Sequence, residues 1–363
     1  MIDVYRFVLA LCVVQDHLLR GGPPGLAWQA VFSFYVLSGF LMTLVLNEIY
    51  GFGPRGFARF FTNRILRLYP AYYAVVLVTV LHIVFVSPAN QLNGALSLPR
   101  TATEWLANVF IVGLVGVDES QMVARRIVPT AWSLTIEIVC YALLAAYFAK
   151  SIPRLWALLG IGLAVAGVHF GRQFWTSPAD YGLMNHYVVL QAGLIPFAVG
   201  GLAYFHRRSR WFEPGGRGIG ILGLLLVLNG GLDYLSEFHR NVSGLYIAVA
   251  LNLFFIPMLY RYDEMHGKQR WQVTLGGIAY PLFISHWFVG TLVFLQFTAL
   301  APRGVAHFLL SLAASILFSL ALYLGIDQNV EKLRGRLKMP RASPQRPWAG
   351  GQPALATLPK LEA

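Results

Sequence analysis

Two ionisable side chains, Arg6 and His17, lie eleven residues apart in the first long apolar stretch of the sequence. At 3.6 residues per helical turn, this spacing returns to within about 20° of the same helix face, roughly 16 Å further along the axis. One face would thus carry a guanidinium and an imidazole, a group that can accept a proton near neutral pH. The alternatives are an interfacial histidine bonded to water and an arginine that snorkels to the interface.

A second basic pair, Arg64 and Arg67, is spaced so that both side chains leave one face of a helix. Two guanidiniums in that arrangement can bind phosphate oxygens bidentately. Because Arg55 and Arg59 precede the pair, the sequence pattern alone favours a basic helix lying on anionic lipid. The spacing therefore permits phosphate binding without requiring it.

Further polar residues lie in or beside apolar stretches. Glu137 is deep in one of them, and a carboxylate there indicates a functional or internally paired group, because burying it in a bilayer costs about 2.5 kcal/mol or more. Trp132 and Ser133 precede it, and an interface anchor and a helix cap are alternatives to acceptor binding. His286 lies within another stretch, where substrate contact and internal hydrogen bonding are both open. Ser38 has no base nearby in the sequence, so we do not expect a serine nucleophile.

Membrane-spanning helices would have to position these groups. Of the 363 residues, 57% are hydrophobic and 12% are charged, and the mean hydropathy is +0.59, whereas soluble domains carry about a quarter charged residues. A span needs about 20 mainly apolar residues. Such stretches occur at 4–20, 28–48, 69–86, 131–149, 154–170, 187–205, 218–235, 243–260, 276–297 and 305–326. The sequence thus predicts an all-α, polytopic transmembrane helix bundle of about ten spans, with an interfacial or re-entrant segment from Trp105 to Val117.

Lys and Arg are distributed unevenly over the predicted loops. Twenty of the 28 lie in loops on one side of the predicted membrane or in the C-terminal tail, and short loops with such an excess stay cytoplasmic. We therefore expect both termini in the cytoplasm and the 87–130 loop outside. The same bias explains the net charge of +12, so no nucleic-acid partner is expected. A membrane domain over residues 1–330 would precede a basic, Pro-rich tail, 331–363, whose composition predicts disorder.

Five segments, taken in chain order, resemble the acyltransferase 3 family. They are Arg6-x10-His17, FSFYVLSGFLM (32–42), RILRLYPAYY (64–73), AWSLTIEIVCY (131–141) and AYPLFISHW (279–287). Each segment alone is a weak signal, but five in register are specific, and they extend over nearly the whole chain. The family comprises ten-helix bacterial inner-membrane enzymes that acylate sugars and other acceptors, often in cell-surface polysaccharides, from acyl-coenzyme A or a similar donor. The chain departs from the common pattern in Gln15-Asp16 and Tyr35, and neither change removes a required chemical group.

The resemblance implies roles for the candidate residues. His17 would be the catalytic histidine, and Glu137 would orient it or bind the acceptor. The donor-side residues would be Arg6, Arg64 and Arg67. The substrate-contacting candidates are Ser38, Trp132, Ser133 and His286.

The resemblance also implies the partners of the reaction. Acyl-coenzyme A, acetyl-coenzyme A by default, would be a co-substrate, and neither a tightly bound cofactor nor a metal is expected. The acceptor would be a carbohydrate or glycan, and the protein would be a multi-pass protein of the bacterial cell inner membrane. The oligomeric state is left open.

Two other classes of function compete with an enzyme. A polar stripe through a helix bundle also describes a transporter or flippase of a lipid-linked or acylated glycan. The sequence contains no paired inverted repeats and no matching broken helices in two halves, which disfavours that class. A receptor or scaffold without chemistry would leave Arg6, His17 and Glu137 unexplained.

Overall fold

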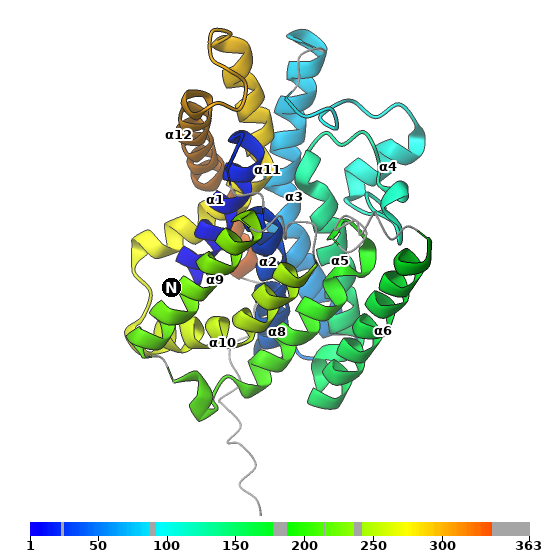
Figure 1. The fold of residues 1–363 in the computed structure, drawn as a ribbon, viewed down its shortest axis with the longest axis vertical. Helices are drawn as coiled ribbons and strands as arrows, with labels where there is room; N and C mark the ends of the chain where they lie inside the picture. The colour runs from blue at the N-terminus through cyan, green and yellow to red at the C-terminus, as the bar shows by residue number, and fades with distance from the viewer. Residues whose placement is uncertain (23–24, 88–91, 177–186, 214, 236–241, 336–363) are drawn as a thin grey trace, which may run out of the picture.

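The computed structural model describes residues 1–22, 25–87, 92–176, 187–213, 215–235 and 242–335, and all regular elements in these ranges are helical (Figure 1). The α-helices are α1 (Ile2–Leu18), α2 (Gly25–Val45), α3 (Pro54–Phe85), α4 (Ala102–Phe110), α5 (Trp132–Ala146), α6 (Ile152–Thr176), α8 (Leu194–His206), α9 (Gly216–Leu235), α10 (Ser243–His266), α11 (Arg270–Gln296), α12 (Val305–Leu322) and α13 (Gln328–Gly335). Short helical turns are η1 (Leu46–Tyr50), η2 (Glu119–Gln121), η3 (Pro129–Ala131), η4 (Phe148–Lys150), η5 (Leu190–Gly193), η6 (Arg210–Phe212) and η8 (Tyr323–Asp327). The all-α prediction is confirmed.

Seven helices in the described residues are long and apolar enough to cross a membrane, which makes this a multi-pass membrane protein. They are Leu26–Tyr50, Pro54–Phe85, Pro129–Ala146, Ile152–His169, Ser243–His266, Arg270–Gln296 and Val305–Gly335. The other three predicted spans fall on shorter helices, because α1 has 17 residues, α8 has 13 and the apolar part of α9 is Gly216–Gly231. The count of ten therefore stays a prediction.

The segment predicted to be interfacial, Trp105 to Val117, overlaps the short helix α4. Its N-terminus is closed by a capping box, in which the Thr101 hydroxyl accepts from the Glu104 backbone N–H at 3.2 Å and the Glu104 carboxylate accepts from the Thr101 N–H at 3.3 Å. Its nine residues are too few to cross a bilayer. Trp105, Leu106 and Phe110 are exposed on its surface, as an interfacial helix requires.

Helix α2 lies in the middle of the bundle, where it contacts α1, α5, α8, α9 and α10 (Figure 1). Its closest approach is to α8. A Cβ atom added to Gly39 would lie 2.4 Å from the Phe197 carbonyl oxygen, and one added to Gly200 would lie 2.0 Å from that of Val36. The two backbones can touch only because both residues are glycine. Gly39 therefore acts in helix packing.

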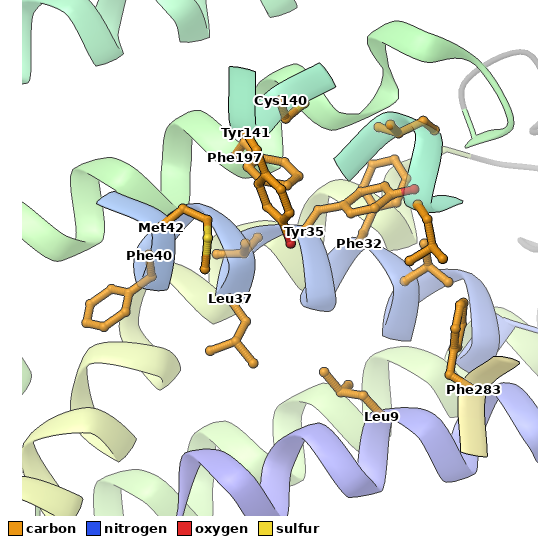
Figure 2. Close-up of a cluster of buried hydrophobic side chains, with 14 of the residues drawn as sticks. Leu9, Phe32, Tyr35, Leu37, Phe40, Met42, Cys140, Tyr141, Phe197 and Phe283 are labelled. Atoms are coloured by element: carbon orange, nitrogen blue, oxygen red, sulfur yellow. The ribbon is translucent and has the colours of Figure 1, made fainter. Parts of the chain in front are cut away.

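A buried aromatic cluster fixes α2, α5 and α8 relative to one another. The ring of Phe197 lies 5.8 Å from the rings of both Tyr35 and Tyr141 (Figure 2). Cys140, beside Tyr141, is also buried in this cluster and forms no disulfide. This packing determines how α2 and α5 face each other, and so where the polar groups of the two helices meet.

Residues near both ends of the described chain, among them Asp3 and Arg334, line one cavity. The N-terminal ammonium of Met1 pairs with Asp263, and Arg67 on α3 pairs with Asp327 at 2.8 Å. Helix α13 continues from η8 to Gly335, so the first five residues of the predicted tail are helical. The remainder of that tail, 336–363, lies outside the described residues.

Candidate active site

A cavity of about 960 Å³ is lined by residues of α1, α2, α3, α5, α10, α11 and α13 and of the turns η1 and η8. Its volume is at the upper end of the range typical of ligand-binding pockets. The candidate residues that line it are Arg6, Ser38, Arg64, Arg67, Ser133 and Glu137. His17, Trp132 and His286 do not line it. The fold thus brings six of the nine candidates together from four helices.

The basic pair on α3 projects into the cavity, and its two members have different partners. Arg67 donates to Asp327 at 2.8 Å, and its guanidinium lies 5.6 Å from the centre of the Tyr280 ring. Arg64 donates to the Asn63 side-chain oxygen at 2.7 Å and forms no ion pair with any described carboxylate. Its Nε is buried without a hydrogen-bond partner. Of the two, Arg64 retains more capacity for an incoming anion.

Arg6 is a second cation that faces the cavity without an ion pair to a described carboxylate. Asp3, one turn earlier on α1, is paired instead with Lys268 at 2.6 Å. Arg6 lies close enough to Arg67 and Glu137 to interact with both electrostatically. Among the arginines of the site, Arg6 and Arg64 therefore form no ion pair with a described carboxylate.

Glu137 is held by two hydroxyl groups. The Ser38 hydroxyl donates to its carboxylate at 3.2 Å and the Tyr141 phenol donates at 2.7 Å. The Ser38 contact crosses from α2 to α5, so sequence reasoning missed the partner. Tyr141 was missed as well, although its position four residues after Glu137 on one helix is a signal for such a contact.

Ser133 and Trp132 begin α5 and have different surroundings. The Ser133 hydroxyl donates to the Thr130 carbonyl at 3.0 Å, and its side chain faces the cavity. Trp132 packs edge-on against Tyr187, with ring centres 5.0 Å apart. Only Ser133 is positioned to meet a molecule in the cavity of this structure.

His17 and His286 form a hydrogen-bonded pair across α1 and α11. His17 Nδ1 lies 2.8 Å from His286 Nε2, and His286 Nδ1 lies 3.1 Å from the Leu282 carbonyl oxygen. A carbonyl only accepts, so His286 Nδ1 carries the proton of the neutral ring and Nε2 accepts. His17 Nδ1 must then donate, which leaves the lone pair of a neutral His17 on Nε2. The internal hydrogen bond considered for His286 is therefore present.

Arg303, in the loop between α11 and α12, contacts the surroundings of this histidine pair. It donates to the backbone carbonyl oxygens of His17 at 2.7 Å and Asp16 at 3.0 Å, and its guanidinium lies 5.7 Å from the centre of the Trp287 ring. Trp287 in turn lies 4.9 Å from the His17 ring. Arg303 adopts φ 60°, which is uncommon for a residue with a side chain. Sequence reasoning missed it because no local spacing links it to α1.

Two aromatic residues of the cavity lining lie near the histidine pair along the chain. Phe34 and Phe283 line the cavity and pack edge to face, with ring centres 6.2 Å apart. Phe283 precedes His286 by three residues on α11, about 4.5 Å along the helix axis. The lining of the cavity thus includes a residue one helical turn before His286.

Comparison with known proteins identifies the family of the chain. Residues 1–324 match the model of the acyltransferase 3 family, which is described as an acyltransferase domain. No curated protein and no solved structure matched the chain. Because the match extends over most of the chain and includes the helices that build the cavity, the chain belongs to the acyltransferase 3 family of membrane acyltransferases.

Proposed function

We propose that this protein transfers an acyl group, by default acetyl, from cytoplasmic acyl-coenzyme A to a hydroxyl of a carbohydrate or glycan in the bacterial inner membrane. The observation that carries the proposal is one cavity lined by Arg6, Arg64, Arg67 and Glu137, whose lining also includes Phe283, one helical turn before His286 of the histidine pair. Family membership supports acyl transfer, and the chemistry of the lining residues supports the choice of donor.

The donor would enter with its nucleotide end toward the arginines of this cavity. Coenzyme A carries several phosphate charges, and guanidinium groups bind phosphate through charge-assisted hydrogen bonds. Arg64 and Arg6 have no carboxylate partner among the described residues, so neither has to give up an ion pair to bind phosphate. The acyl arm would then extend along the cavity toward Phe34 and Phe283.

His17 would act as the general base. As the acceptor hydroxyl oxygen attacks the thioester carbonyl, its proton passes to His17 Nε2, and the carbon–sulfur bond then breaks. The coenzyme A thiolate leaves and takes a proton from the imidazolium, which restores neutral His17. His286 would keep His17 in the tautomer that this step requires.

Glu137 and Ser38 would bind the acceptor. A carboxylate that accepts from the Ser38 hydroxyl can accept equally from a sugar hydroxyl that enters the cavity. Ser133 lines the same cavity and would add a further polar contact. These groups would orient the attacking hydroxyl, while its proton goes to the histidine.

Release of coenzyme A by purified protein in nanodiscs tests this function. Wild type with acetyl-coenzyme A and a panel of glycans should release thiol and label an acceptor, whereas His17→Ala should be slower by about 10²- to 10⁴-fold. His266→Ala is the matched control, because this exposed histidine contacts the backbone of its own helix and should keep full activity. Equal rates in wild type and His17→Ala would refute the histidine mechanism.

A further inference from the structure

Helix α13 lies beyond the family-matched segment, which ends at residue 324, yet it contributes a side chain to the same cavity. Arg334, near the end of this helix, is buried against α3 with 9% of its surface exposed. It donates to the side-chain oxygen of Asn63 at 3.1 Å and pairs with Glu331 one turn earlier. The last described helix thus places a third arginine beside Arg64 and Arg67.

Arg334 and Arg64 share a single neutral acceptor. The Asn63 oxygen accepts from Arg64 at 2.7 Å as well as from Arg334. The Nε atoms of both arginines and the amide nitrogen of Asn63 are buried without a hydrogen-bond partner in the described part of the chain. Three buried donors without acceptors are unfavourable in an empty site. A group with several acceptor oxygens would satisfy all of them.

The charges at this point also favour an anion. Arg67 is balanced by Asp327, and Arg334 is balanced by Glu331, whose side chain is half exposed. Arg64 pairs with no described carboxylate. One positive charge in the cluster is therefore left for an anionic ligand.

We infer that Arg334 and Arg64, held together by Asn63, form a clamp for a phosphate of the nucleotide end of the donor. The inference rests on the proposed function and names the part of that donor that α13 holds. Arginine suits this position because its planar fork binds two phosphate oxygens at once, whereas the ammonium of lysine acts as a point charge. Helix α13 would thus distinguish donors with a nucleotide from those without one.

Donors with and without a nucleotide test the clamp. KM is measured for acetyl-coenzyme A and for acetyl-pantetheine, which has the same thioester and no nucleotide, in nanodiscs of neutral phosphatidylcholine. Arg334→Ala should raise KM for acetyl-coenzyme A about tenfold or more and leave KM for acetyl-pantetheine unchanged. Arg334→Lys should lie between wild type and Arg334→Ala. Arg59→Ala is the control, because Arg59 is exposed on the same helix as Arg64 and does not line the cavity.

Binding of adenosine 3′,5′-bisphosphate, followed by calorimetry, separates failure of the clamp from failure of the proposed function. If wild type turns over neither donor, the proposed donor is wrong, and the clamp still predicts that Arg334→Ala weakens this binding about tenfold. Unchanged binding, or an equal rise in KM for both donors, would overturn the clamp. It is also overturned if Arg334→Ala weakens only adsorption to anionic vesicles, because the arginine then holds lipid headgroups. If Arg334→Ala does not fold, the clamp is tested by measuring KM for both donors and binding of adenosine 3′,5′-bisphosphate in Arg334→Lys.

Discussion

At the scale of single residues, the site depends on which nitrogen of His17 carries the proton. The Leu282 carbonyl fixes the tautomer of His286, and His286 fixes that of His17. A backbone carbonyl cannot titrate, so this chain of bonds directs the lone pair of His17 to Nε2 without a charged partner. The pair lies in an apolar layer that contains Trp287, where an unpaired carboxylate would be costly.

Substitutions of His286 should distinguish the loss of its hydrogen bond to His17 from a change in the shape of the side chain. His286→Phe removes the acceptor for His17 and should lower kcat about 10²-fold, because His17 is then free to adopt the wrong tautomer. His286→Gln places an amide oxygen near the position of Nε2 and should recover much of that loss. Thiol-release kinetics measure both variants, and equal losses in the two would contradict a role in setting the tautomer.

Glu137 offers a second test at this scale. Glu137→Gln keeps the size of the side chain and can still accept from Ser38, but it removes the charge that we propose strengthens binding of the acceptor hydroxyl. We expect kcat/KM for the glycan to fall about tenfold or more while KM for acetyl-coenzyme A stays constant. Tyr141→Phe removes a single hydrogen bond to the same carboxylate and should have a smaller effect. A rise in KM for acetyl-coenzyme A alone would indicate instead that Glu137 binds the donor.

At the scale of elements, the contact between α2 and α8 positions the site. Ser38 is next to Gly39, whose Cα faces the backbone of α8, so the distance between these two helices determines where the Ser38 hydroxyl lies relative to α5. The aromatic rings around Phe197 fill the space beside the contact (Figure 2). Catalytic geometry is therefore sensitive to a packing contact that carries no polar group.

Enlarging Gly200 should disrupt this contact. Gly200→Leu places atoms where the α2 backbone already lies, and should cost about 3 kcal/mol or more because a backbone cannot move aside as a side chain can. Thermal unfolding in detergent should show a lower Tm together with reduced acyl transfer. Gly160→Ala is the control, since that position on α6 has open space around it and alanine favours the helix by about 1 kcal/mol. An unchanged Tm in Gly200→Leu would mean that the two helices do not touch in the membrane.

At the scale of the whole molecule, the number of crossings determines which side the substrates approach from. Residues 2 and 3 line the same cavity as residues from η8 and α13, near the other end of the described chain. The predicted ten crossings would place both ends on one side of the membrane, with α1, α8 and α9 added to the seven longer helices. The basic loops predict that this side is cytoplasmic.

Single cysteines test this topology in intact cells. With Cys12 and Cys140 replaced by alanine, Arg100→Cys should react with a membrane-impermeant maleimide, because its loop is expected outside. Arg59→Cys and Lys150→Cys should react only after the membrane is opened. All three positions are exposed, so a lack of reaction reports the side of the membrane and not burial. Labelling of Arg59→Cys in intact cells would reverse the proposed orientation.

The sequence by itself determined the helical class, the membrane environment and six of the polar and charged residues that line the cavity. These depend on local properties, namely the length of each apolar run and the spacing of side chains along one helix. Arg64 and Arg67 could be assigned to one helix face because residues three apart always share a face in an α-helix. The order of five short segments was enough to indicate the family, which the match over residues 1–324 confirms.

Tertiary structure decided which side chains meet. His17 and His286 are 269 residues apart, Ser38 and Glu137 are 99 apart, and Arg334 and Asn63 are 271 apart. Each contact depends on how far one helix is rotated and displaced against another, and that geometry follows from packing such as that of Gly39 and Gly200 and not from any local pattern. For this reason the sequence could propose the arginines and the histidine, while the tautomer of His17, the partner of Ser38 and the place of Arg334 depended on the assembled bundle.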